Sequence, residues 1–154
     1  MRGILPFMKQ LVLTTHTGVN LNYPLPGLTA FVRQHASGTP ADHPNLLQKL
    51  ELIFAPGQAD GGFVILGLDD AEDSLIGVLA MESAAATQSG QHRLITLVMH
   101  REHRRQGHGH ALLRSGKMLT REHILLALPP SHDLAPFFQQ AGFEALDDAL
   151  VLKR

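Results

Sequence analysis

The sequence predicts a mixed α/β domain in which one mostly antiparallel sheet carries helices on both faces. Three short apolar runs follow one another in the middle of the chain, separated by turn-rich segments, as expected of an antiparallel meander. The apolar period then changes to that of an amphipathic helix, and another β-prone run follows it. A strand, helix, strand unit therefore joins the meander, which makes the sheet mixed.

One strand and two helices are predicted before the meander. A β-prone run extends from Lys9 to Thr15. A first helix is expected after Pro26-Gly27, with apolar residues at helical spacing and an end near His35. A second helix is expected over residues 46–54, with Asn45 as the N-cap. Both helices have one apolar face, so we expect them to cover the same face of the sheet.

The meander consists of three apolar runs, Phe63–Leu68, Leu75–Met81 and Leu94–Met99. The first gap, residues 69–74, is acidic and short enough for a hairpin. The third run has neighbouring apolar residues without strict alternation, which is typical of a strand buried on both faces. We therefore expect Leu94–Met99 to be a central strand.

An amphipathic helix is predicted after Gly109. Its basic side would carry Arg114, Lys117 and Arg121. The opposite side, expected to face the core, comprises Ala111, Leu112, Ser115, Met118 and Leu119.

The C-terminal part is predicted to add two strands and a short helix. Ile124–Leu128 is a β-prone run stopped by prolines, and Leu134–Gln140 is a helix that ends at Gly142. Ala149–Lys153 is the last predicted strand. All these elements fit within one domain that spans residues 1–154.

Composition narrows the class of protein. A formal net charge of -1 provides no general attraction to nucleic acid or to acidic membranes, so no partner of either kind is expected. The chain has no cysteine, which excludes thiolate metal sites and cysteine nucleophiles. The first residues contain one arginine and a short apolar run broken by Pro6, too little for a signal peptide, and we expect a cytoplasmic protein.

The segment with the strongest chemical signal is residues 104–109, between the third meander strand and the amphipathic helix. Gly107 and Gly109 allow a tight turn that leaves backbone N–H groups free at the helix N terminus. The helix dipole adds about half a positive charge there, and nearby arginines supply more. A pyrophosphate is the expected ligand.

Two other phosphate-binding motifs fit poorly. A nucleotide-hydrolase loop needs a lysine directly after its second glycine, and neither glycine is followed by one here. The dinucleotide fingerprint would require a third glycine at Leu112.

The spacing Arg104-x-x-Gly107-x-Gly109 instead resembles the Arg/Gln-x-x-Gly-x-Gly/Ala motif of the GNAT superfamily of acyl-CoA N-acyltransferases. Phe137 to Phe143 is similar to the aromatic signature that ends a later helix in that family. The resemblance covers about residues 93–143. It implies a GNAT-like domain whose central sheet has a V-shaped splay, with acetyl-CoA as cosubstrate and no metal.

The resemblance also implies which residues bind the coenzyme. The turn would hold the pyrophosphate, and the strand before it would pair its backbone with the pantetheine arm. Ser131 stands where relatives commonly have an asparagine that contacts this arm. The implied coenzyme-binding residues are Val98, Met99, Arg104, Arg105, Gln106, Gly107, His108, Gly109, His110, Ser131 and Phe138.

Two departures from the family pattern affect catalysis. Phe138 replaces the tyrosine that often protonates the leaving thiolate, and phenylalanine has no O–H. Arg93 stands where many relatives carry a glutamate base. Glu82 is then the first candidate for a general base and His92 the second.

Histidines are concentrated in the same region, since seven of the ten lie between His92 and His132. Metal binding is not expected, because His108 and His110 should point to different sides of the turn and no His-Glu-x-x-His helix is present.

The sequence therefore predicts an N-acetyltransferase that acts on a primary amine. The alternative is a non-catalytic acyl-CoA-binding or sensing module with the same fold, supported by Phe138 and Arg93. Loops over residues 35–45 and 83–91 are expected to border the acceptor pocket, and a homodimer is left open. A small metabolite, a polyamine, a peptide N terminus and a lysine side chain all remain candidate acceptors.

Overall fold

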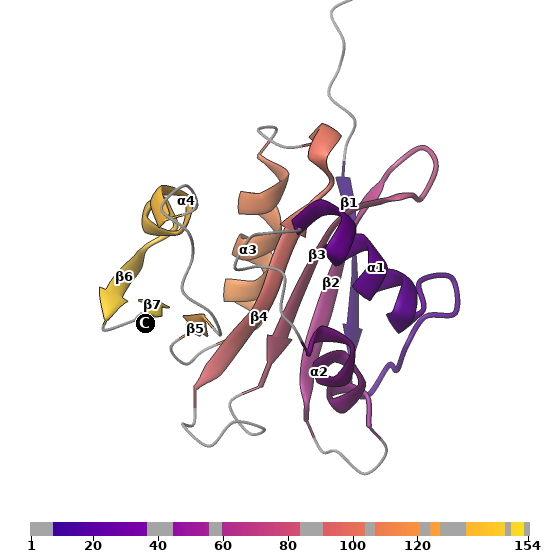
Figure 1. Cartoon of the computed structure of the whole chain (residues 1–154), viewed down its shortest axis with the longest axis horizontal. Coiled ribbons are helices and arrows are strands. Elements are labelled where there is room, and N and C mark those ends of the chain that lie inside the picture. Colours follow the sequence, from indigo (N-terminus) through magenta and orange to yellow (C-terminus); the bar gives the residue numbers. More distant parts are fainter. Residues whose placement is uncertain are drawn as a thin grey trace, which may run out of the picture.

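The computed structural model describes residues 8–36, 45–55, 60–83, 91–103, 107–120, 124–126, 135–146 and 149–152. Seven strands form one sheet in the order β1-β2-β3-β4-β5-β7-β6 (Figure 1). Within these residues, no helix is both long enough and apolar enough to cross a membrane.

The first four strands form an antiparallel sheet, as predicted. They are β1 (Met8–Thr14), β2 (Gly62–Asp69), β3 (Leu75–Glu82) and β4 (His92–Met99). Each pairs antiparallel with the next, and a tight hairpin joins β2 to β3, as residues 69–74 indicated. β4 is the fourth of the seven strands, which confirms the central position expected for it.

After β4 the chain crosses over through α3 (His108–Met118) to β5 (Ile124–Leu126), which is parallel to β4. This confirms the predicted strand, helix, strand unit. The described pairing between β4 and β5 joins His92–Leu94 to Ile124–Leu126. The expected splay stays a prediction, because it concerns residues after Leu126 that lie outside the described part.

The C-terminal segment contains α4 (Ala135–Gln140), β6 (Phe143–Leu146) and β7 (Ala149–Leu152). Gly142 ends the α4 turn with a φ of 102°, a conformation that glycine adopts readily. The sequence predicted α4 and β7 but missed β6. That strand has four residues and includes the exposed Glu144, so it has no distinctive local pattern, and it is defined by its pairing with β7.

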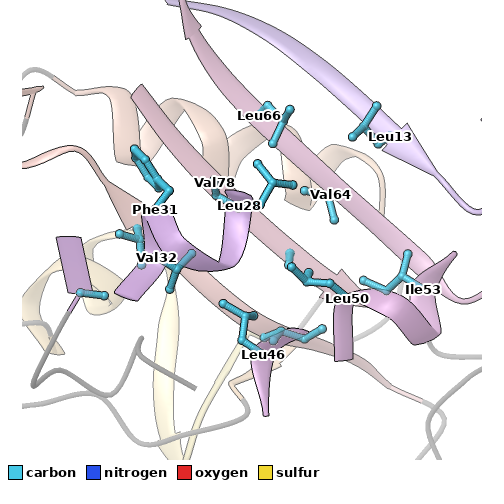
Figure 2. Packing of buried hydrophobic residues seen from close by; sticks show 14 of the residues in the cluster. Leu13, Leu28, Phe31, Val32, Leu46, Leu50, Ile53, Val64, Leu66 and Val78 are labelled. Atoms are coloured by element: carbon cyan, nitrogen blue, oxygen red, sulfur yellow. The ribbon is translucent and has the colours of Figure 1, made fainter. Parts of the chain in front are cut away.

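Two helices, α1 (Leu25–Ala36) and α2 (Leu46–Ile53), cover one face of the sheet, as predicted (Figure 2). α1 begins at Leu25, so Pro26 and Gly27 lie in its first turn and not before it; a proline is tolerated there because the first amides of a helix have no intrahelical acceptor. Asn45 occupies the N-cap position of α2, but its side chain makes no capping hydrogen bond.

Strand alternation separates the two cores of the molecule. Val64 and Leu66 of β2 face α1 and α2, whereas Phe63 and Ile65 face the side of α3. The sheet therefore has helices on both faces, as expected.

The buried face of α3 differs from the predicted one. Met118 and Leu119 are 79% and 50% exposed, whereas the residues that face the sheet are His108, Leu112, Leu113 and Gly116. At Gly116 a built Cβ would lie 3.3 Å from Leu79 Cδ1, so α3 packs closely on β3 at a residue with no side chain. Counting apolar side chains therefore placed Leu112 correctly on the buried face but Met118 and Leu119 wrongly.

Candidate active site

The predicted coenzyme turn lies at the end of the central strand. β4 ends at Met99, a short 3-10 helix, η1 (Arg101–His103), follows, and α3 begins at His108. Arg104, Arg105 and Gln106 lie outside the described residues, as does Ser131. The described part of the site therefore consists of the end of β4 and η1 on one side of the turn and the start of α3 on the other.

Gly107 is the N-cap of α3 and has a left-handed backbone, with a φ of 81°. Among the described residues, no heavy atom would lie within 4 Å of a Cβ at this position, so contacts with them do not demand a glycine. The backbone conformation does, because an L-residue in the left-handed region is strained by about 1–2 kcal/mol. The sequence correctly singled out this residue as a turn glycine.

Gly109 is constrained by packing instead. A Cβ built on it would lie 3.3 Å from Cε1 of Phe137 and 3.6 Å from Cγ of Met99. The last strand residue before η1 and the first aromatic residue of α4 thus meet at the start of α3. This contact brings the two parts of the sequence that carry the family resemblance together in space.

The N terminus of α3 is suited to an anion. Within α3, the N–H of Ala111 bonds the carbonyl of Gly107. The amides of Gly109 and His110 precede it, in the first turn, where an α-helix offers no intrahelical acceptor. The aligned peptide dipoles add about half a positive charge at this end. This helix end therefore offers what a phosphate group requires.

Three histidines lie near this helix end, and they differ in burial and in the groups they contact. His108 is buried, and burial lowers its pKa, with a further decrease from nearby His103. His108 is accordingly neutral at pH 7 and contributes no charge to the anion site. His110 stacks on Phe137, with ring centroids 4.2 Å apart, so it points to a different side from His108. Nδ1 of His103 is buried and has no hydrogen-bond partner in the described part of the chain.

Among the described residues, no group of three or more histidine, aspartate or glutamate side chains is arranged to hold a metal ion.

β4 carries an irregularity that the sequence did not reveal. Ala80 of β3 pairs with Thr96, but the next residue, Met81, pairs with Leu94, which leaves Ile95 as an extra residue in β4. Such a bulge re-aims the backbone groups beside it. The described pairing with β5 also stops at Leu94. The bulge therefore lies where the backbone of the central strand leaves its regular ladders.

Val98 and Met99, predicted to pair with the coenzyme arm, lie just beyond this bulge. Val98 is buried on the face of α1 and α2, and Met99 packs on the opposite face, toward α3. Their side chains thus serve the two cores, so any hydrogen bond to a ligand must come from their backbone.

Phe138 is 8% exposed and belongs to the core on the α3 side. Its ring meets Phe137 and Phe143 edge to face, at centroid distances of 5.1 and 5.4 Å. The phenylalanine therefore acts as a packing residue between α4 and β6, a role that needs no O–H.

The two candidate bases lie at the other end of β4. Glu82 pairs with Arg93 across β3 and β4, and its Oε1 lies 3.4 Å from Nζ of Lys49. Six residue steps separate Arg93 from Met99, or roughly 20 Å of strand. The structure thus places Glu82 and His92 near the start of β4, while Val98, Met99 and Gly107–His110 gather near its end.

Comparison with known proteins identifies this arrangement. The sequence profile of the Acetyltransferase (GNAT) family matches residues 30–143, which is more than half of the chain and includes β4, η1, α3 and α4. The chain belongs to the GNAT family. No curated protein matches the sequence.

Solved structures of GNAT proteins share the fold across nearly the whole chain. A GNAT acetyltransferase from Staphylococcus aureus Mu50 superimposes with a TM-score of 0.66 at 15% identity, covering 94% of this chain and 99% of the other. An acyl-CoA N-acyltransferase from Pseudomonas aeruginosa has a TM-score of 0.65 at 16% identity, over 96% and 99%. The IAA acetyltransferase of Bacillus cereus has a TM-score of 0.63 at 11% identity, over 96% and 100%.

Membership of the GNAT family indicates which general reaction this fold supports. This fold supports acyl-CoA-dependent acyl transfer, and the Gly107–Gly109 turn at the end of β4 stands where the sequence resemblance placed the coenzyme.

Proposed function

We propose that this GNAT protein transfers an acetyl group from acetyl-CoA to a primary amine by direct attack. One observation supports this most strongly: Gly107 holds a left-handed turn, uncrowded by the other described residues, at the N terminus of α3, directly after the central strand. A helix end of this kind binds the pyrophosphate of a coenzyme through backbone amides.

The chemistry needs orientation more than a covalent intermediate. The amine nitrogen attacks the thioester carbonyl, a C–N bond forms and the C–S bond breaks; one proton leaves the nitrogen and one reaches the thiolate sulfur. A backbone N–H aimed at the developing oxyanion stabilises the tetrahedral intermediate. The bulge at Ile95 and the strand that follows it are the part of β4 proposed to supply this donor. The coenzyme's remote pyrophosphate contributes binding energy that positions the thioester.

Proton transfer requires a donor to the leaving sulfur and an acceptor for the proton of the amine. Phe138 has no O–H to donate, so water or another group protonates the leaving sulfur. Glu82 and His92 remain the proposed bases, acting through water because they lie at the far end of β4. The ion pair with Lys49 restrains the side chain of Glu82.

The same features support one alternative, a non-catalytic acyl-CoA-binding or sensing module. Phe138 is buried among aromatic rings, and Glu82 already has a cationic partner. Such a protein would keep the coenzyme turn and lack turnover.

One experiment separates the two functions. Pure protein is incubated with acetyl-CoA and a panel of amines that contains small metabolites, polyamines, lysine peptides and free peptide N termini, and released thiol is followed. Thiol release that depends on one amine supports the enzyme. Coenzyme binding without such release supports the module. A thermal shift with acetyl-CoA and CoA but not with NAD reports binding, because a ligand specific for the folded state raises the melting temperature. A melting temperature that neither acetyl-CoA nor CoA changes would contradict both functions.

A small-molecule or peptide amine is the proposed acceptor, and a cytoplasmic protein, monomeric or homodimeric, is the proposed setting. The two loops expected to border the acceptor pocket lie largely outside the described residues.

A further inference from the structure

A row of histidine rings connects α1 to the start of the coenzyme turn. The ring of His35, in α1, lies between Phe31 at 4.6 Å and His100 at 4.2 Å, measured between centroids. His100 follows the last residue of β4, and His103 in η1 lies 5.4 Å from it. His35 is 6% exposed, so this contact belongs to the interior of the protein.

The backbone amides of residues 100–103 explain why these rings are there. The N–H of His100 bonds Ile76 O of β3 (2.6 Å), and the N–H of His103 bonds His100 O (2.9 Å). The other two amides are bonded by side chains. Arg101 N–H donates to His35 Nδ1 (3.3 Å), and Glu102 N–H donates to His100 Nδ1 (3.1 Å). All four donors of the segment are therefore satisfied, two of them by imidazole nitrogens.

Both imidazoles can accept these bonds only while Nδ1 carries no proton. In the neutral ring one nitrogen accepts and the other donates, whereas both nitrogens donate in the protonated ring. Because a backbone N–H faces Nδ1 in each case, the neutral form with its proton on Nε2 is the one that fits. Protonation would set two donors against each other; the cost is larger at the part-buried Arg101–His35 bond than at the exposed Glu102–His100 bond, where water can accept from the amide.

We propose that His35 and His100 are positioning residues for coenzyme binding: they hold η1, the segment that leads into the turn before Gly107, and their protonation loosens it. This inference rests on the proposed function, because it takes the turn after η1 as the coenzyme site. Acidification is then expected to weaken coenzyme binding over the range in which histidine titrates.

Other charged groups on the packed elements modulate this effect. Arg33, Arg101 and Glu102 are exposed, so water and salt screen them. Lys49 is paired with Glu82. His103 and His108 continue the row, with centroids 6.4 Å apart, and a proton on either would oppose a second one nearby. Only a proton on His35 or His100 removes an acceptor from an η1 amide, and it is this step that loosens η1.

The test uses two kinds of variant. One keeps a hydrogen-bond acceptor for the η1 amide but cannot be protonated, and the other removes the acceptor. Asparagine carries its side-chain oxygen on Cγ, as histidine carries Nδ1, so His35→Asn and His100→Asn keep an acceptor that cannot be protonated. His35→Leu keeps apolar packing and removes the acceptor. His16→Asn, at an exposed histidine outside the row, is the matched control.

The first measurement is the acetyl-CoA dissociation constant between pH 8 and pH 5.5. We expect the wild type and His16→Asn to weaken roughly tenfold over this range. The double variant His35→Asn/His100→Asn should bind normally at pH 8 and lose most of that dependence. His35→Leu should bind more weakly at every pH. Titration of the coenzyme's own phosphates affects all variants equally, so it does not alter the difference in pH dependence between them. An equal pH dependence in the double variant and the wild type would overturn the proposal.

The second measurement is amide hydrogen exchange without coenzyme, corrected for the intrinsic rate. Protection of Arg101 and Glu102 should fall on acidification in the wild type, and His35→Asn should abolish this fall at Arg101 alone. Unprotected amides at pH 8, or protection unaffected by pH, would contradict the positioning role. If the wild type binds no coenzyme at any pH, the proposed function fails instead, and the exchange result still decides whether the histidines hold η1.

Discussion

Gly107 and Gly109 are two residues apart, yet different constraints select glycine at each. At Gly107 the backbone has a positive φ, and the other described residues leave room for a Cβ. At Gly109 the backbone is helical, and the ring of Phe137 and the side chain of Met99 leave little room. The motif spacing identified both residues, but the separate reasons follow only from the contacts.

Gly109→Asp is expected to bind acetyl-CoA roughly tenfold more weakly than Gly109→Asn, because aspartate alone adds a negative charge at the helix N terminus. Both side chains have similar volumes and meet the same Phe137 ring, so the comparison isolates charge. The same charge favours the helix without ligand, and Gly109→Asp should therefore resist urea at least as well as Gly109→Asn. Titration with coenzyme and urea unfolding measure the two effects. Equal affinities of the two variants for acetyl-CoA would show that no anionic group of the coenzyme binds at this helix end.

Phe138→Tyr tests the missing acid. If a proton donor at this position limits turnover, the tyrosine should raise kcat by about tenfold or more and add a basic limb to its pH profile. Phe137→Tyr, one residue away in α4, is the control that adds the same hydroxyl elsewhere. Steady-state kinetics with the best amine of the panel decides the matter. An unchanged kcat in stable Phe138→Tyr protein would show that protonation of sulfur is not limiting.

At the scale of elements, the hairpin between β2 and β3 depends on one unusual residue. Asp73 has a φ of 59°, and it forms an ion pair with Lys9 of the neighbouring β1. This pair raises the pKa of Lys9, chiefly through its hydrogen bond to Asp73. Tyr23 also reaches the hairpin, since its hydroxyl donates to Asp73 O at 2.6 Å.

Asp73→Ala is expected to lower the free energy of unfolding by about 1–2 kcal/mol, because alanine is strained in the left-handed region. Asp73→Asn should cost less than that, since asparagine tolerates this conformation and the exposed ion pair contributes little. Urea denaturation of both variants measures the difference. A larger loss for asparagine than for alanine would mean that charge, and not backbone strain, dominates at this turn.

The elements also show how far sequence reasoning reaches. β1 to β4, α1 to α4 and β7 were predicted close to their observed bounds, because periodicity and turn residues are local signals. The contact face of α3 was predicted wrongly at Met118 and Leu119, since the close approach at Gly116 contributes no apolar side chain to count. β6 was missed because a four-residue strand is stabilised by its partner more than by its own sequence.

On the scale of the whole molecule, the buried His108 connects folding to pH. The folded chain lowers the pKa of His108 below its ordinary value of 6.5, so the unfolded chain takes up this proton at a higher pH. The stabilising contribution is therefore fully present above about pH 6.5 and is lost as the pH falls through the lower folded pKa.

Stability should accordingly decrease on acidification from about pH 6.5, and His108→Leu should reduce this dependence. The exposed His16, changed to alanine, serves as the control. Urea unfolding at several pH values gives the slope of the unfolding free energy for each protein. An identical slope in His108→Leu and the wild type would mean that other groups account for the acid sensitivity.

The sequence by itself determined the order of the elements except β6, the glycine turn after the central strand and the family motif, because each depends on residues close together in the chain. Tertiary structure alone decided which distant side chains meet. His35 accepts a hydrogen bond from Arg101, 66 residues away, and Lys49 of α2 pairs with Glu82 of β3. Such contacts follow from strand register and helix docking, which bring together groups that no local pattern relates.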